Sequence, residues 1–252
     1  MLLHRVHAVN TAPESENKIH DDRIAANYGF RGGLVPGVTV YGYMTLPVLD
    51  HFGEQWLDRG GMSVRLRAPV YDGEDIAIEA DPVDGGRIEI VLEGGRASGV
   101  AWLNHEIDAP SSERAAPPLP SHDARPPASR ESLSAGVVLG TLIKKLAPED
   151  RPISAPLPPV IGPGKAAHPT RLLALSNELL MSNVVLGPWI HASSEVSNFS
   201  SVHDGDEITV AGRVEEAYER KGHEFAVLDI VLRSGARTVQ TVRHTVIWRL
   251  RS

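Results

Sequence analysis

The sequence contains no cysteine, and this absence excludes several kinds of site at once. Disulfide bonds, thiolate nucleophiles and cysteine-ligated zinc all require Cys side chains. Aromatic residues make up only 5% of the chain, and no apolar run approaches the roughly 20 residues of a membrane-spanning helix. The opening MLLHRVHAVN is too short and too polar for a secretory signal peptide. These absences predict a cytoplasmic protein that does not enter a membrane.

Excess basic charge is also missing. The chain carries 25 Lys and Arg against 32 Asp and Glu, a formal net charge of −7. Nucleic acids and anionic membranes are bound by clustered cations, so neither is expected as the main partner. The phosphate-binding motifs GxGxxG and GxxxxGK[S/T] are absent, which disfavours nucleotide chemistry. With 42% apolar and 23% charged residues, the 252-residue chain has the composition of a globular protein of one or two domains.

Proline is concentrated in one segment. Residues 108–130, DAPSSERAAPPLPSHDARPPASR, hold six prolines and show neither helical nor strand periodicity. Such a composition is typical of an extended, semi-rigid connector. The segment therefore predicts a linker between an N-terminal unit, residues 1–107, and a C-terminal unit, residues 131–252.

The two units resemble each other at a constant offset of 132 residues. APVYDGEDIAIEADPV aligns with SSVHDGDEITVAGRV, and the helix candidate 36–53 aligns with 168–185. Pro36 and Pro169 lie near the first helical position, where a missing N–H costs little. Pro47 is expected to kink or end the first helix. That helix is apolar on nearly every side, which predicts burial in the core.

After each helix candidate the sequence reads as a series of strands. Period-two alternation is clear in EITVAGRV and TVQTVRHTV, and DG or GG pairs mark the turns. One helix followed by about four antiparallel strands, repeated twice, predicts an α+β fold. In this fold each unit wraps a sheet around its helix, and the two sheets can join edge to edge.

The stretch SENKIHDDRIAANYGF gathers polar side chains just before the first helix, including Asn17, His20 and Asp22. One interpretation is a capped short helix, and the other is a catalytic site. In a helix, Glu16 and His20 would share a face and could form a carboxylate–imidazole pair. In a loop, Asp22 or Glu14 are the candidates. The spacing alone leaves both possibilities open.

NKIHDDRIAA followed by YGFRGGLVPGVTVYG resembles the signature of MaoC-like proteins, the group that includes the (R)-specific enoyl-CoA hydratases. The resemblance implies a double hotdog fold and the reversible hydration or dehydration of enoyl and 3-hydroxyacyl thioesters. It implies that His20 moves a proton and that Asn17 orients it. Ser15 stands where this family has its catalytic Asp, so Glu16 or Asp22 would have to supply the carboxylate.

The same resemblance implies a thioester site at the start of the first helix, formed by Pro36, Gly37, Val38 and Tyr41. Backbone N–H groups at Gly37 and Val38 would hold the thioester oxygen. The expected substrate is an acyl-CoA or acyl-carrier thioester of fatty acid metabolism, and the expected assembly is a monomeric double hotdog or a homodimer. No cofactor is required, because hydration involves no redox step. The position 132 residues after His20 is Pro152, which predicts one site per chain.

Two alternatives remain beside hydration. A hotdog thioesterase would use a helix carboxylate, for which the chain offers Asp50 or Glu178, and a degenerate hotdog would bind an acyl chain or a partner without chemistry. No metal site is expected, because His4 and His7 would face opposite sides of a strand. The remaining candidates are expected to be packed or surface side chains: His168, His191, His203, His223 and His244.

Overall fold

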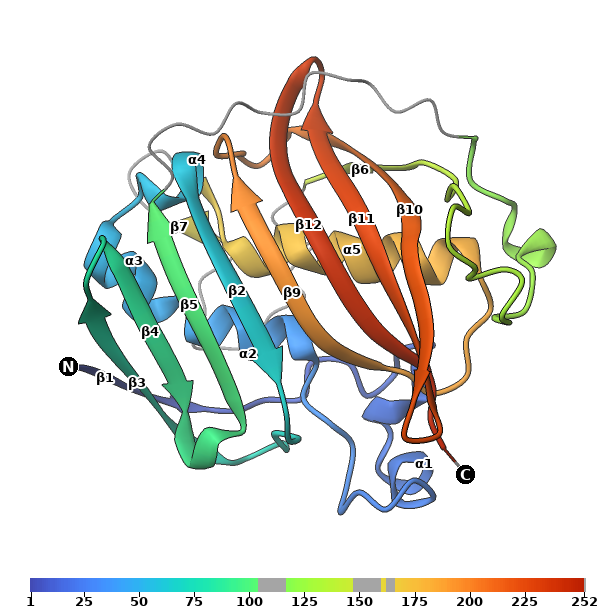
Figure 1. Cartoon of the computed structure of the whole chain (residues 1–252), viewed down its shortest axis with the longest axis horizontal. Helices are drawn as coiled ribbons and strands as arrows, with labels where there is room; N and C mark the ends of the chain where they lie inside the picture. Colours follow the sequence, from blue (N-terminus) through green and yellow to red (C-terminus); the bar gives the residue numbers. More distant parts are fainter. Residues whose placement is uncertain (104–116, 147–159, 162–165, 252) are drawn as a thin grey trace.

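The computed structural model describes residues 1–103, 117–146, 160–161 and 166–251. In this part of the chain, ten strands form one antiparallel sheet in the order β1-β3-β4-β5-β2-β9-β12-β11-β10-β6 (Figure 1). The first half of the sheet consists of β1 (Leu2–His7), β2 (Gly60–Leu66), β3 (Asp75–Val83), β4 (Arg87–Leu92) and β5 (Ala97–Leu103). The second half consists of β6 (Leu142–Lys145), β9 (Ile190–Asn198), β10 (Glu207–Arg220), β11 (His223–Ser234) and β12 (Arg237–Arg249).

The two half-sheets meet where β2 pairs with β9. Their register runs antiparallel from the Gly61 and Ser197 pair to the Arg65 and Ser193 pair. On either side of this seam the strand order is mirrored, since β1, β3, β4, β5 and β2 correspond to β6, β10, β11, β12 and β9. The predicted arrangement of two units joined edge to edge is therefore confirmed. A separate two-stranded ladder pairs β7 (Val160–Ile161) with β8 (Ala166–Ala167).

Helices lie against one face of the sheet, where α2 (Gly37–Met44) and α5 (Pro169–Asn183) contact each other (Figure 1). Their first residues are 132 positions apart, as the repeat predicts. All residues of α2 after Gly37 are buried, which confirms the expected core helix. The shorter helices are α1 (Asp22–Ala26), α3 (Leu46–Phe52) and α4 (Trp56–Arg59).

The predicted first helix is two helices in the structure. Helix α2 ends at Met44, Thr45 follows it, and α3 begins at Leu46 with Pro47 in its first turn. Proline has no N–H to donate to the preceding turn, so it is tolerated at a helix start and not in a helix interior. The corresponding α5 has no internal proline and continues for 15 residues.

The second half-sheet is longer than the first. Strands β10, β11 and β12 have 14, 12 and 13 residues, whereas β3, β4 and β5 have 9, 6 and 7. The added length carries the β10–β11 turn toward α1 and the C-terminus (Figure 1). This extension brings His223, at the start of β11, to the region of the N-terminal motif.

Part of the predicted linker packs against the second half. Ala128 N donates to Val185 O at 2.8 Å, and Thr141 N donates to Pro117 O at 2.8 Å. Residues 108–116 of that linker lie outside the described residues. Within the described ranges, no helix combines the length and the apolar character needed to cross a membrane.

Candidate active site

A cavity of about 240 Å³ lies where the N-terminal motif, the start of α2 and the start of β9 meet. Most of its lining is apolar. Its polar and charged lining side chains, apart from Trp189, are Asn17, His20, Arg67, Asn177, His191 and His223. Among the residues that the structure describes, no Asp or Glu lines this cavity. A largely apolar cavity that is lined by Arg67 and, within these residues, by no carboxylate disfavours a cationic ligand.

Asn17 joins the motif to the second half of the chain. Its Oδ1 accepts hydrogen bonds from Ile19 N at 3.3 Å and from Trp189 N at 3.1 Å, while its Nδ2 donates to Trp189 O at 3.0 Å. The first of these bonds caps the short 3₁₀ turn Lys18–His20. With only 4% of its surface exposed, Asn17 fixes the motif against the residue that precedes β9.

His20 is held so that Nε2 is its unprotonated ring nitrogen. Its Nδ1 lies 2.7 Å from Leu34 O, and a carbonyl oxygen can only accept, so Nδ1 carries the proton. Burial lowers the pKa of His20, against a smaller opposing effect of the Leu34 bond. The ring is therefore neutral at neutral pH, and the lone pair of Nε2 accepts a long hydrogen bond from Asn17 Nδ2 at 3.4 Å. Such a nitrogen can act as a general base.

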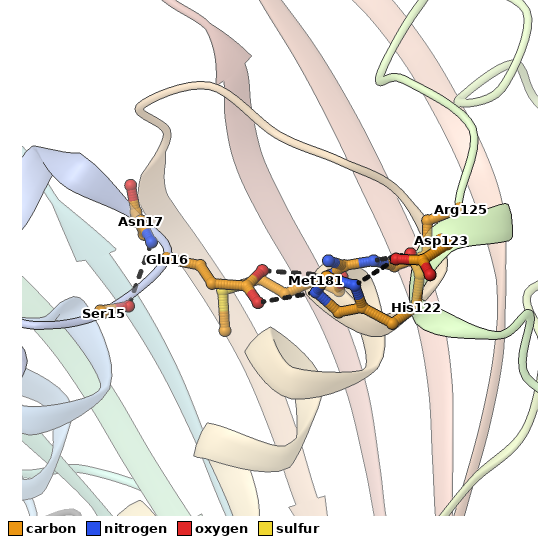
Figure 2. Close-up of polar contacts among 7 residues, drawn as sticks. All are labelled: Ser15, Glu16, Asn17, His122, Asp123, Arg125 and Met181. Atoms are coloured by element: carbon orange, nitrogen blue, oxygen red, sulfur yellow. Dashed lines mark hydrogen bonds and ion pairs between the residues drawn. The ribbon is translucent and has the colours of Figure 1, made fainter.

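The carboxylates near the motif are engaged elsewhere. Glu16 faces Arg125 at 3.0 Å and His122 at 3.6 Å (Figure 2), and the Arg125 hydrogen bond is the main cause of its lowered pKa. Asp22 Oδ1 accepts from Gly33 N at 2.7 Å, which fixes the loop before α2. The structure brings neither side chain to His20, and Glu14 is exposed.

Ser15, at the position where the MaoC-like signature has Asp, forms a hydrogen bond within its own turn. Its Oγ accepts from Asn17 N at 3.1 Å (Figure 2), and it does not line the cavity. The hydroxyl therefore shapes the backbone ahead of the 3₁₀ turn that contains His20. Of the expected catalytic set, the structure brings together Asn17 and His20 at the cavity.

The start of α2 forms another wall of the cavity. Gly37 lines it, and a Cβ there would lie 2.6 Å from Leu66 Cδ1 and 2.7 Å from His191 Nδ1. The first N–H groups of a helix have no intrahelical acceptor and carry partial positive charge. Pro36 caps the helix, and Val38 and Tyr41 are buried but do not line the cavity. Burial raises the pKa of Tyr41.

The second half contributes a polar chain that the sequence did not reveal. His191 Nε2 lies 2.8 Å from Ser194 Oγ, which lies 2.8 Å from His244 Nδ1. His244 Nε2 in turn lies 3.0 Å from Asn177 Oδ1. His191 and Asn177, the two ends of this chain, both line the cavity. The sequence did contain one indication of this chain. His244 alternates with the inward-facing Val242 and Val246, and a polar side chain at such a buried position needs hydrogen-bond partners.

The helix carboxylates that a thioesterase would need do not reach the cavity. Asp50 lies 3.0 Å from His4, and Glu178 lies 3.2 Å from Lys144. Neither belongs to the cavity lining.

Solved structures with the same architecture exist at low sequence identity. A conserved Mycobacterium tuberculosis protein, described as essential for survival during infection and as having a double hotdog fold, is 13% identical with a TM-score of 0.62; the match covers 98% of this chain and 95% of that one. A MaoC-like dehydratase is 11% identical with a TM-score of 0.55, covering 98% and 97%. A Lactobacillus plantarum protein named as a candidate oleoyl thioesterase is 10% identical with a TM-score of 0.57, covering 99% and 96%.

These likenesses confirm the double hotdog fold, and a MaoC-like protein is among the structures that share it. The sequence matches no protein-family model and no curated protein sequence.

Proposed function

We propose that this chain is an acyl-thioester enzyme that reversibly hydrates enoyl thioesters to 3-hydroxyacyl thioesters. The observation that carries the proposal is the geometry of His20, whose Nδ1–H is fixed by Leu34 O while Nε2 keeps a lone pair in a cavity that Gly37 also lines. A base and a helix N-terminus at one cavity are the two parts that enolate chemistry needs. The names of the structural neighbours are compatible with thioester substrates.

In the dehydration direction, His20 Nε2 takes the proton from Cα of the 3-hydroxyacyl thioester. The released electron pair forms an enolate, whose oxygen is stabilised by the N–H group of Gly37 at the start of α2, the part of the helix that lines the cavity. When the carbonyl re-forms, the C–O bond at Cβ breaks, and the protonated His20 returns its proton to the departing oxygen, which leaves as water. Hydration is the reverse sequence. The reaction is redox-neutral and needs no cofactor.

A single base serves both proton transfers in this mechanism, because no carboxylate lines the cavity in the described part of the chain. Asn17 holds the loop and orients the His20 ring through the 3.4 Å contact. The positions of Asp50 and Glu178 outside the cavity favour hydration over hydrolysis by a helix carboxylate.

The test is incubation of the purified protein with trans-2-enoyl-CoA thioesters of short, medium and long chain. We expect the conjugated enoyl absorbance to fall with no release of free thiol. Release of free thiol would identify a thioesterase instead. Saturable binding without loss of absorbance would identify a non-catalytic binding protein, and either result would overturn the proposal.

A further inference from the structure

In the chain of hydrogen bonds from His191 to Asn177, the donor and the acceptor of each bond can be assigned. The assignment starts at His191. His191 Nδ1 is buried and has no hydrogen-bond partner in the described part of the chain. A buried N–H without an acceptor is rarer and more costly than a buried lone pair without a donor. His191 therefore carries its proton on Nε2, which donates to Ser194 Oγ.

The remaining protons follow from this first one. Because Ser194 Oγ accepts from His191, its own hydroxyl proton is free to donate to His244 Nδ1. His244, with Nδ1 accepting, carries its proton on Nε2 and donates to Asn177 Oδ1. Burial lowers the pKa of His191 to about 4. Burial also lowers the pKa of His244 well below its usual value, so both rings stay neutral.

The direction of the chain fixes the amide of Asn177. Since Oδ1 is taken by His244, the NH₂ group is the end that remains, and it has no hydrogen-bond partner in the described part of the chain. Asn17, the other cavity amide, uses Oδ1 on Trp189 N and Nδ2 on Trp189 O and His20 Nε2. His20 offers a lone pair, not a proton, to the cavity. Asn177 is thus a neutral donor whose orientation is fixed by the hydrogen bond from His244 to its Oδ1.

We propose that Asn177 is a substrate-contacting residue whose NH₂ group donates to the thioester carbonyl, and that His191, Ser194 and His244 are positioning residues that enforce this orientation. The inference rests on the proposed acyl-thioester function. It places a substrate contact in the second half of the chain, opposite the motif of the first half. The donor would bind the ground-state carbonyl and bind more strongly as negative charge develops on it.

The orientation is tested without any substrate. Long-range ¹H–¹⁵N NMR on protein labelled in its histidines reports which ring nitrogen carries the proton. At neutral pH we expect both His191 and His244 to be neutral and protonated on Nε2. A proton on Nδ1 of His244 would mean that the Asn177 amide faces the other way, with its oxygen toward the cavity, and would overturn the donor role.

The contact is tested with Asn177→Asp, which keeps an acceptor for His244 and removes both N–H donors at nearly the same size. We expect kcat/KM on the preferred enoyl thioester to fall by about 10²- to 10³-fold, the usual effect of losing one such donor. The new carboxylate faces His244, so Nε2 of His244 should stay protonated, and thermal melting shows whether the variant is folded. Glu178→Gln, the adjacent residue outside the cavity, is the matched control and should leave kcat/KM unchanged.

The two proposals fail in different ways. Full turnover in a folded Asn177→Asp protein would overturn the Asn177 contact and leave hydration intact. A wild-type protein that neither converts nor binds any enoyl thioester would overturn the proposed function and the contact together.

Discussion

Where the first half of the sheet pairs Met62 with Ala101, the second half pairs Ser194 with His244. Met62 and Ser194 are 132 residues apart and occupy matching strands, β2 and β9, and all four side chains are buried. On the helices, Thr45 of the first half corresponds to Asn177 of the second. Thr45 Oγ1 donates to Gly42 O within its own helix turn, whereas Asn177 accepts from His244 across the core.

The two halves share their backbone arrangement but differ in their buried side chains. Strand order, helix starts and the register at the seam are shared, because backbone pairing depends on alternation more than on particular side chains. The buried side chains differ, since each core needs only to be filled and to have its polar groups satisfied. The first half has an apolar interior behind an N-terminal polar motif, whereas the second half lacks that motif and adds buried polar side chains such as Ser194 and His244 to a mostly apolar core. The cavity is lined by residues of the N-terminal motif and by residues of the polar chain in the second half.

The contribution of the first half is tested most strongly by His20. If Nε2 is the base, His20→Ala should lower kcat by about 10²- to 10⁴-fold. His20→Asn serves as the variant that protects the fold, because its amide can still donate to Leu34 O while lacking any group at the Nε2 position. Turnover is measured on enoyl thioesters beside thermal melting, with His7→Ala, at an exposed site, as the control.

His20 also predicts how turnover depends on pH. Because burial lowers the pKa of His20, wild-type kcat/KM should hold at neutral pH and fall with acidification only below the ordinary His value of about 6.5. A His20→Asn protein with wild-type turnover would remove His20 from the mechanism.

The link between the halves is tested by Asn17→Ala. This change leaves the buried N–H and C=O of Trp189 without their side-chain partner. An unsatisfied buried backbone group costs about 1–3 kcal/mol, so we expect the free energy of unfolding to fall by about 2–4 kcal/mol. Urea denaturation measures this loss. Asn27→Ala, at an exposed position after α1, should change stability by less than about 0.5 kcal/mol, and equal losses in the two variants would contradict the bridge.

The contact between α2 and β9 is tested by Gly37→Ala. The added Cβ would lie within 3 Å of both Leu66 and His191, so side chains would have to move. Gly187→Ala is the control, because a Cβ there meets nothing within 4 Å. Both changes reduce the freedom of the unfolded chain, and this gain cancels in the comparison. We expect Gly37→Ala to be less stable than the control by about 1–3 kcal/mol, the cost of overpacking. Equal stabilities would show that this wall of the cavity is loose.

The histidine content of the second half predicts a difference in acid sensitivity. His168, at the N-cap of α5, is fully buried, and burial lowers its pKa to about 4. Below pH 6.5 the unfolded chain takes up a proton that the folded chain excludes. The contribution of this histidine to the free energy of unfolding is therefore fully present above this pH. It is lost as the pH falls toward 4, by at most about 1.4 kcal/mol per pH unit for each such group.

Removing this group should flatten the pH dependence. His168→Asn retains an acceptor for Thr170 N, now at 3.3 Å from Nδ1, since Asn is a favoured N-cap residue. Denaturant titrations between pH 7 and 5 should give a slope smaller by up to about 1.4 kcal/mol per pH unit than in the wild type. An unchanged slope would mean that His168 takes up its proton in the folded protein at the same pH as in the unfolded chain.

Most of the fold could be predicted from the sequence, because period-two strands, the 132-residue offset and Pro47 act locally or by repetition. The seam between β2 and β9 was predicted only as a possibility, since nothing local specifies which strands pair across it. For the site, the resemblance to the MaoC-like signature led us to expect Asn17, His20 and Gly37 near one another, whereas their spacing alone left this open.

The rest of the site depends on residues that are distant in the chain. The direction of Glu16 is set by Arg125, which lies 109 positions away. The orientation of Asn177 is set by His244, 67 positions away. Spacing rules for helices and strands say nothing at such separations. Only the structure shows that Glu16 and Asp22 are engaged away from His20, and that the second half contains a buried polar chain.

The seam between β2 and β9 also governs how the protein resists aggregation. Among the residues that the structure describes, the ten-stranded sheet ends in β1 on one side and β6 on the other, and both strands are short. The first carries His4, Arg5 and His7, and the second carries Lys144 and Lys145. Short, charged terminal strands are poor templates for pairing with another chain. The longer β2 and β9, which would be open in separate halves, cover each other, so the fusion of the two units hides the backbone most prone to self-association.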